Sequence, residues 1–210
     1  MSAASSSAAD DSNRIRVPVV ISAPHVHLTA ELIEELFCDK YHLHVRSPLS
    51  QPLQFAAEES VSLIGPRGRI SNVRIIGPPR SENQIELPHS AALALGIDAP
   101  IRESGALAGT PGITIEGPRT RATLESGVIR ALRHIHMNRD FAEQLELQDH
   151  DRIDVVSIRD LPAPLFEDVV VRVAPGFQLE LHVDADEAAA RGLRMGDYVF
   201  LGRARGRRAP

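Results

Sequence analysis

The 210-residue sequence contains one cysteine, no tryptophan and few aromatic residues of any kind. Because Cys38 has no second cysteine to pair with, an intramolecular disulfide framework is excluded, which fits a reducing compartment. Aromatic residues make up 4% of a chain that is 43% hydrophobic, so the core must consist mainly of Val, Ile, Leu and Ala. Cys38 ends the apolar segment ELIEELFC, where we expect a buried structural thiol rather than a nucleophile.

The sequence also lacks any apolar run near the roughly 20 residues that a membrane-spanning helix needs. Residues 1–13 are rich in Ser, Ala and Asp and have no apolar centre. They do not resemble a signal peptide, and we expect them to be disordered. The prediction is a cytoplasmic protein with no membrane partner.

A basic surface of the kind that binds nucleic acid is missing as well, since the formal net charge is −5 at pH 7. The exception is a cluster of arginines near the C-terminus, where we expect residues 204–210 to form a basic, flexible tail. No nucleic-acid partner is predicted.

Short β-type runs separated by Gly and Pro dominate the rest of the chain, and they predict strands. These runs are residues 15–22, 60–66, 71–78, 112–118, 152–158, 168–175, 177–183 and 197–202. Helical patterns are confined to four short segments, residues 29–37, 89–96, 138–147 and 184–192. This combination favours a mainly β fold of small barrels or sandwiches with short capping helices.

An internal repeat links two distant parts of the sequence. The segments VVISAPHVHLTAELIEELF and GVIRALRHIHMNRDFAEQL both run from a strand through His-x-His to a helix. Thr29 and Asn138 stand two residues after the second histidine of each pair, and both are favourable N-cap residues. The two halves of the chain are therefore predicted to share one local structure.

A second pair of similar segments follows the first. NQIELPHSAALALG resembles FQLELHVDADEAAARG, and aligning them on their final glycines places Glu86 opposite His182. Each half thus offers two histidines and one further residue that can bind a metal.

The spacing of these residues supports metal ligation. In an extended chain, residues i and i+2 point to the same face about 6.6 Å apart, close enough for two imidazoles to converge on one cation. A third ligand leaves a coordination position open, as in catalytic zinc sites. The predicted ligand sets are His25, His27 and Glu86, and His134, His136 and His182. Their donor atoms suit Zn²⁺, with Co²⁺ as the alternative.

A single His-x-His pair is weak support, because most such pairs are ordinary strand residues. His42 and His44 have the same spacing but lie outside the repeat, and we interpret them as ordinary residues. The lone histidines His89 and His150 stand beside turn-like segments and are predicted to lie on the surface.

Two further features suggest anion binding. Arg80 follows a Gly-Pro-Pro turn, where it could bind phosphate through paired hydrogen bonds; a solvated loop arginine is the competing interpretation. Residues 102–112 form a Gly-rich loop that lets backbone approach a ligand, but they lack the lysine pattern of a phosphate-binding loop.

Seven motifs follow one another from about Arg14 to Gly202. They are VPVVISAPHVHLT, PLSQPLQFAAEESV, NVRIIGPPR, NQIEL, APIRESGALAGTPGITIEGP, GVIRALRHIHM and LELHVDADEA. In this order they resemble the phosphate propanoyltransferases, which are phosphotransacylases of the propanediol-utilisation type. Seven ordered motifs are far more specific than any one of them.

The resemblance implies two interleaved β-barrel lobes, related by the repeat and capped by short helices, with a dinuclear metal site between them. One lobe would comprise residues 14–23 and 132–203, and the other residues 24–131. It implies two zinc ions per chain on the two ligand sets named above. It also implies that Arg80 contacts phosphate and that Gln54 lies near the coenzyme A pocket.

The activity implied is acyl-CoA + phosphate ⇌ acyl phosphate + CoA for short acyl groups such as propanoyl and acetyl. The implied partners are coenzyme A, phosphate and acyl phosphate, a second copy of the chain in a homodimer, and shell or cargo proteins of a bacterial microcompartment. The location would then be the cytoplasm or the lumen of such a compartment. Residues 1–14 nevertheless lack the apolar stripe of a targeting helix.

The sequence departs from the family pattern at two positions near the implied pocket. Pro24 stands where a basic residue is common, and Leu53 where a glycine is frequent. Neither change removes a ligand.

Two other classes of function stay open at this point. A metal-dependent hydrolase could use the same ligand sets to activate water. A non-catalytic module with structural zinc would instead need fully protein-ligated metal, which three ligands per half do not provide.

Overall fold

The structure is a computed structural model that describes residues 15–157 and 164–206. The predicted disordered segment 1–13 therefore lies outside the described residues, as do residues 207–210 of the predicted tail. The first residues of that tail, from Ala204 to Gly206, belong to the last strand.

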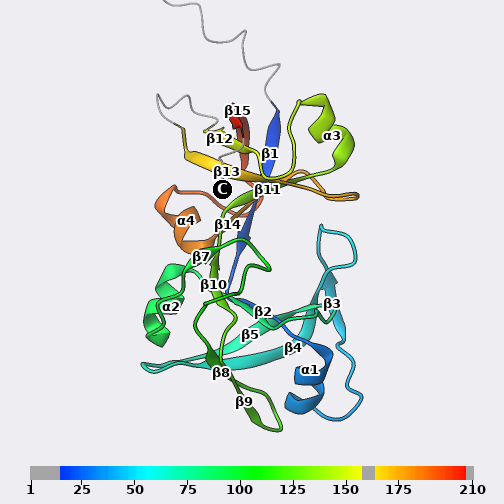
Figure 1. Ribbon diagram of the computed structural model, residues 1–210, viewed down its shortest axis with the longest axis vertical. Coiled ribbons are helices and arrows are strands. Elements are labelled where there is room, and N and C mark those ends of the chain that lie inside the picture. Colours follow the sequence, from blue (N-terminus) through cyan, green and yellow to red (C-terminus); the bar gives the residue numbers. More distant parts are fainter. Residues whose placement is uncertain (1–14, 158–163, 207–210) are drawn as a thin grey trace, which may run out of the picture.

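Two β lobes lie at opposite ends of the long axis of the molecule (Figure 1). The first lobe is a closed six-stranded barrel. Around the barrel the strands are β1 (Arg16–Ser22), β14 (Glu180–Asp184), β11 (His134–Met137), β13 (Phe166–Val173), β12 (Arg152–Val156) and β15 (Tyr198–Gly206). Closure pairs β1 with both β14 and β15, so the barrel has no free edge.

The second lobe is a nine-stranded sheet that forms a half-barrel. Its order is β7 (Ile101–Arg102), β10 (Val128–Ala131), β6 (Gln84–Glu86), β2 (His25–His27), β5 (Arg69–Gly77), β4 (Phe55–Ile64), β8 (Ile113–Glu116) and β9 (Arg121–Leu124), with β3 (Val45–Pro48) paired to β4. The mainly β class and the interleaved lobes are confirmed. The second lobe is only half a barrel, because its end strands β7 and β9 are short and are not paired with each other.

The chain passes between the lobes at two places. It leaves the barrel after Ser22 and enters the half-barrel at His25, and it returns between Ala131 and His134. Each crossing is directly followed by a His-x-His strand, β2 or β11. The crossings therefore place both histidine pairs where the two lobes meet.

Within residues 15–157 and 164–206, four short helices cap the lobes: α1 (Ala30–Leu36), α2 (His89–Leu95), α3 (Arg139–Gln144) and α4 (Ala185–Ala190). The predicted N-caps are confirmed, because the side chain of Thr29 accepts from Leu32 N–H and that of Asn138 accepts from Phe141 N–H. These caps end the two His-x-His strands and start α1 and α3 in the same way.

Helix α2 receives its cap from the other lobe. Its own N-cap residue, Pro88, has no side-chain capping bond, but the Asp186 carboxylate accepts from Ser90 N–H at 2.6 Å and from Ser90 Oγ at 2.8 Å. Asp186 lies in α4, so this contact holds the two lobes together.

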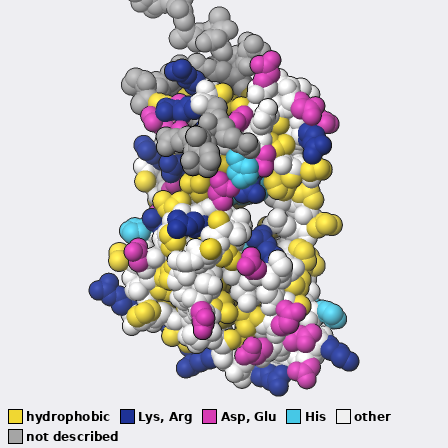
Figure 2. Space-filling model, in the orientation of Figure 1, with side chains coloured by type: hydrophobic (Ala, Val, Ile, Leu, Met, Phe, Trp, Pro, Cys, Tyr) yellow, Lys and Arg dark blue, Asp and Glu magenta, His cyan; other side chains and the backbone are white. Residues whose placement is uncertain are grey.

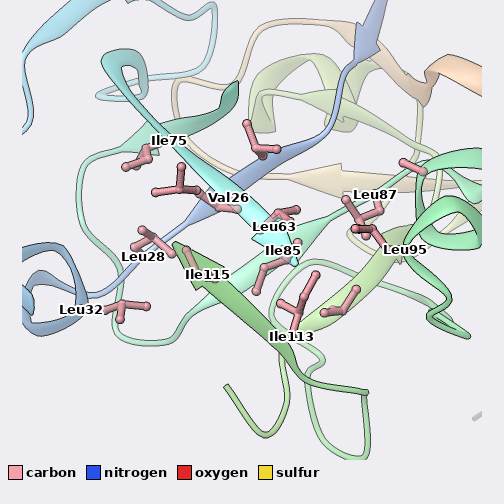
Figure 3. Packing of buried hydrophobic residues seen from close by; sticks show 14 of the residues in the cluster. Val26, Leu28, Leu32, Leu63, Ile75, Ile85, Leu87, Leu95, Ile113 and Ile115 are labelled. Carbon is pink, nitrogen blue, oxygen red and sulfur yellow. The ribbon is translucent and has the colours of Figure 1, made fainter. Parts of the chain in front are cut away.

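Each lobe has its own aliphatic core. Figure 3 shows the core of the half-barrel, where Val26 of β2 and Ile85 of β6 pack among Ile75, Leu63 and Ile115. The barrel core is a separate cluster that includes Ile135 and Leu181. Because Val26, Ile85, Ile135 and Leu181 fill the cores, their strand neighbours must point the other way.

Cys38 is exposed, which corrects the expectation of a buried thiol. Helix α1 ends at Leu36 with Phe37 as its C-cap, so Cys38 lies beyond the helix. The buried positions of the helix are Leu32, Ile33 and Leu36.

On the face shown in Figure 2, acidic and basic side chains are interspersed rather than gathered by sign. Among the described residues, no helix has both the length and the apolar character needed to cross a bilayer.

Candidate metal centre

A cavity of about 470 Å³ lies between the lobes and is lined by residues of both. All the predicted site residues line it: His25, His27, Gln54, Arg80, Glu86, His134, His136 and His182. His25 and His182, 157 positions apart in the sequence, are therefore brought to one cavity, a suitable setting for binding a small ligand.

The first ligand set combines β2 and β6, which pair antiparallel with His25 opposite Glu86. The distance from His25 Nε2 to Glu86 Oε2 is 3.4 Å, and that from His27 Nε2 to Glu86 Oε1 is 3.6 Å. Metal bonds of about 2.0–2.1 Å in a tetrahedral site separate ligand atoms by about 3.3–3.4 Å. The two distances join the histidines to different oxygens of Glu86, and each is close to the separation of two ligand atoms on a single cation.

The second ligand set combines β11 and β14, which also pair antiparallel, with His134 opposite His182. The rings of His134 and His182 stack with centroids 5.0 Å apart, and the His136 ring lies 4.5 Å from that of His182. One ligand atom from each residue of a set lies within 4.8 Å of the others, in both sets.

The two sets orient their first histidine identically. His25 Nδ1 bonds to the Ala23 carbonyl oxygen at 2.9 Å, and His134 Nδ1 bonds to the Leu132 carbonyl oxygen at 2.8 Å. In each case Nδ1–H donates to the carbonyl two residues earlier, which leaves Nε2 as the free donor atom for a metal.

Two ring nitrogens in the second set are buried without a hydrogen-bond partner. These atoms are His136 Nδ1 and His182 Nε2. His182 Nε2 lies 3.3 Å from Glu180 Oε2, but the two make no hydrogen bond. Because buried polar atoms are nearly always satisfied, buried ring nitrogens without a hydrogen bond are consistent with an open metal site.

His134 and His136 of the second set are neutral at physiological pH. Burial, together with the neighbouring imidazoles, lowers the pKa of His134 to about 4 and that of His136 to about 2. The unprotonated imidazole is the form that binds a metal.

The first set behaves differently because it contains a carboxylate. Burial alone would lower the pKa of His25, but the Glu86 carboxylate raises it above its ordinary value. Burial would raise the pKa of Glu86, but His25 and His27 hold it well below its usual range. Glu86 therefore carries its negative charge, which the second set has no counterpart for among its three imidazoles.

Gln84 fixes the carboxylate of the first set. Its side-chain amide donates to Glu86 Oε1 at 2.5 Å and to Ser104 Oγ at 2.8 Å, and its carbonyl oxygen accepts from Gly105 N–H at 2.7 Å. The Gln84 side chain is itself buried, so it is held in place beneath the more exposed loop residues Ser104 and Gly105. Gln84 was not predicted, although its place two residues before Glu86 on the same face of β6 would have indicated it.

Arg80 lies in the loop after β5, at the edge of the cavity. Its backbone N–H donates to the Leu28 carbonyl at 2.9 Å, and its Nη1 donates to Ser104 Oγ at 3.3 Å. Burial lowers the pKa of the guanidinium, and the Glu86 carboxylate opposes that shift. The side chain is thus held at the cavity beside the first ligand set.

Glu180 and Arg172 lie beside the second ligand set, and Arg172 also lines the cavity; the sequence indicated neither residue. Glu180 Oε2 accepts from Ser50 Oγ at 2.6 Å and from Gln51 Nε2 at 2.8 Å, which ties the loop before β4 to the barrel. Arg172 lies in β13 opposite His136. In the sequence, each is a charged residue within an apolar run. Its role can be interpreted only when the pairing of the strands is known.

Gln54 lines the cavity in the same loop as Gln51, and its backbone N–H donates to the Gln51 carbonyl. The nearby Leu53 has φ 63° and is 90% exposed. This left-handed conformation suits glycine, which accounts for the frequent glycine noted at this position. Pro24 also lines the cavity.

His42 and His44 lie away from the cavity residues. The His44 ring bonds to Glu59 Oε1 at 2.7 Å through Nδ1, and His42 is exposed. His89 is exposed at the start of α2, whereas His150 Nδ1 lies 3.1 Å from Glu103 Oε2. Neither His42 nor His44 belongs to a metal-binding group among the described residues.

A family model described as phosphate propanoyltransferase matches residues 18–194. Several curated proteins with that name are similar to the chain. The protein from Thermotoga maritima is 45% identical over 183 residues, and those from Citrobacter freundii and Salmonella typhimurium are each 42% identical over the same length. In all three comparisons the match covers 87% of this chain and 87% of the relative.

Proposed function

The chain belongs to the phosphate propanoyltransferase family, and from this we propose that it interconverts acyl-CoA plus phosphate and acyl phosphate plus CoA, for short acyl groups. Membership of the family supports an acyltransferase of the phosphotransacylase type. The finer proposal concerns the metal, the phosphate contact and the coenzyme A contact.

One observation carries the proposal. Two ligand sets of equivalent geometry and Arg80 line the same cavity between the lobes. Such a cavity can bind two substrates side by side, and holding both reactants in place supplies much of the rate enhancement of a transfer reaction.

We propose that His25, His27 and Glu86 would hold one zinc ion and His134, His136 and His182 a second, with cobalt as an alternative metal. The buried unpaired nitrogens of His136 and His182 and the 3.4–3.6 Å spacing around Glu86 support this fit. Bound zinc would supply Lewis acidity to the acyl carbonyl or the phosphate and favour a thiolate over a thiol.

Arg80 is proposed to bind the phosphoryl group. When the coenzyme A sulfur attacks the acyl phosphate carbonyl, the C–S bond forms, the C–O bond to phosphate breaks, and charge develops on the leaving phosphate. A guanidinium at the cavity edge stabilises that charge through paired hydrogen bonds. Gln54 is proposed to contact coenzyme A from the loop before β4, and no acylated enzyme is required.

The test is CoA-dependent release of phosphate from acetyl and propanoyl phosphate, with the metal content of the same sample. Strict dependence on CoA, two zinc equivalents and loss of activity with a chelator would support the proposal. Phosphate release without CoA would indicate a hydrolase instead. Tightly held metal without turnover would indicate a structural module.

The family also leads us to propose a homodimer, a role in propanediol degradation and an association with bacterial microcompartment proteins. Sedimentation of the purified chain tests whether it forms a homodimer. Co-purification with shell or cargo proteins, from cells that make microcompartments, tests the association with microcompartment proteins.

A further inference from the structure

The Gly-rich loop between β7 and β8 contacts two cavity arginines through adjacent residues. Ser104 Oγ accepts from Arg80 Nη1 at 3.3 Å, and Glu103 Oε2 lies 3.5 Å from Arg172 Nη1. Arg80 belongs to the half-barrel and Arg172 to the barrel, so this loop reaches one arginine from each lobe. Since consecutive Cα atoms are about 3.8 Å apart, the two guanidinium groups approach the same short stretch of backbone.

Arg172 stands beside the second ligand set. It is paired with His136 across the parallel strands β13 and β11, and neighbouring strands lie about 4.8 Å apart. It also lines the cavity, with its side chain about one-third exposed. A cation is thus placed next to the barrel half of the site, as Arg80 is next to the other half.

The ion pairs of Arg172 are long. Its Nη1 is 3.5 Å from Glu103 Oε2, and its Nε is 3.9 Å from Asp149 Oδ1. By contrast, Arg121 and Glu116 of the β8–β9 hairpin pair at 2.5 Å. Glu103 Oε2 also lies 3.1 Å from His150 Nδ1, so Glu103 keeps a partner if Arg172 moves to a ligand.

We propose that Arg172 is a second phosphoryl-binding residue, which holds the phosphate or acyl phosphate from the barrel side while Arg80 holds it from the other lobe. This inference rests on the proposed phosphotransacylase function. When phosphate binds, Arg172 exchanges its two long contacts with carboxylates for shorter bonds to phosphate oxygens.

The chemistry of the phosphoryl group fits two arginines better than one. A phosphoryl group offers three peripheral oxygens, and a guanidinium binds two of them in a fork. As the C–O bond to the acyl group breaks, the phosphate gains charge on the oxygen that leaves. Cations on both sides of the cavity neutralise that charge and hold the phosphate while the sulfur adds to the acyl carbonyl and the C–O bond breaks.

Coenzyme A also carries phosphate groups, so the experiment must separate the two sources. We would measure the KM for inorganic phosphate with acyl-CoA as co-substrate, the KM for acyl phosphate, and the KM for CoA. The variants are Arg172→Gln, the conservative Arg172→Lys, and Arg121→Gln as a matched control that breaks an Arg–Glu pair outside the cavity. Thermal unfolding and phosphate binding by calorimetry would accompany the kinetics.

In Arg172→Gln, the KM for phosphate and for acyl phosphate should rise about 10- to 100-fold, the worth of charge-assisted hydrogen bonds, with the KM for CoA unchanged. The phosphate affinity of Arg172→Gln should fall by the same factor. Arg172→Lys should recover part of the lost affinity, and Arg121→Gln should bind phosphate as wild type does. Glu103→Gln should bind phosphate at least as tightly as wild type, because the anion no longer competes with a carboxylate.

An unchanged KM for phosphate in Arg172→Gln would overturn the inference, and so would a rise confined to CoA. A weaker phosphate site in Glu103→Gln would also overturn it, because Arg172 would then act only by holding the loop. If Arg172→Gln does not fold, the KM for phosphate of Arg172→Lys and the phosphate affinity of Glu103→Gln still test the inference. A wild-type protein without CoA-dependent turnover would instead contradict the proposed function itself.

Discussion

Glu86 and His182 hold equivalent positions in the two lobes: Glu86 pairs with His25 across β2 and β6, and His182 pairs with His134 across β11 and β14. Both pairs are antiparallel, and both bring a third donor to face a His-x-His pair. The internal repeat is therefore a repeat of ligand geometry in which one residue has changed from a carboxylate to an imidazole.

Replacing His134 with alanine should remove one metal equivalent and abolish turnover while the fold persists. The ring is part of the cavity lining rather than of the barrel core, so its loss leaves the packing of Ile135 and Leu181 in place. Metal analysis, activity and circular dichroism would measure the three effects. His42→Ala is the control, and undiminished activity in His134→Ala would remove the second ligand set from the mechanism.

Replacing Gln84 with alanine should weaken metal binding at the first ligand set. Gln84 donates to Glu86 Oε1 at 2.5 Å, and loss of such an orienting partner typically lowers metal affinity about 10- to 100-fold. Chelator competition would measure the affinity of each metal. The exposed Gln148→Ala variant is the control, and equal affinities in Gln84→Ala and wild type would show that Glu86 is oriented by other groups.

The His44–Glu59 pair should make stability depend on pH in two opposite ways. The Glu59 carboxylate raises the pKa of His44 above its ordinary value of 6.5. Its contribution to stability is therefore complete below pH 6.5 and is lost as the pH rises through the higher folded-state pKa. Burial would raise the pKa of Glu59, but hydrogen bonds from His44 and Tyr41 hold it below 4.5, so its contribution is lost as the pH falls through that lower value.

Urea unfolding of wild type and His44→Gln at pH 6 and pH 9 would measure this dependence. The difference in free energy of unfolding between the two proteins should be larger at pH 6 than at pH 9. His42→Gln, two residues away and exposed, should give the same small difference at both values. A His44→Gln difference that grows with pH would contradict the assigned pairing.

Replacing Ile135 with alanine should destabilise the barrel by about 2–5 kcal/mol, because the side chain is fully buried in the barrel core and its removal leaves a cavity. Ile101, which is 49% exposed, is the matched control, and its replacement should cost less than about 0.5 kcal/mol. Equal unfolding free energies for the two variants would mean that the core closes around the missing side chain.

The metal-ligand candidates were accessible to sequence reasoning because they depend on local geometry. His25 and His27, or His134 and His136, share a face through the two-residue period of a strand, and Thr29 and Asn138 mark the helix starts that follow. The third donors came from aligning the repeat. The structure brings these residues to one cavity, and metal binding itself stays a prediction.

Apart from Gln84, the residues that support the ligand sets could not be found in this way. Strands β2 and β6 have three residues each, too few to show a periodic pattern, so the sequence did not predict that they pair. Arg172 and Glu180 come to lie opposite His136 only because β13 and β14 flank β11, which is a property of barrel closure. Cys38 was placed wrongly because the helix ends two residues earlier than its apolar pattern.

The interleaving of the lobes also fixes the order in which the protein can be completed on a ribosome. Strand β1 pairs through Arg16 with Phe200 and through Val19 with Leu181, so its neighbours are translated about 160–180 residues later. At about 5–20 residues per second, this delay is on the order of 8–36 s. The half-barrel can assemble during that time, whereas Val17 and Val19 stay without their final neighbours until the last strand emerges.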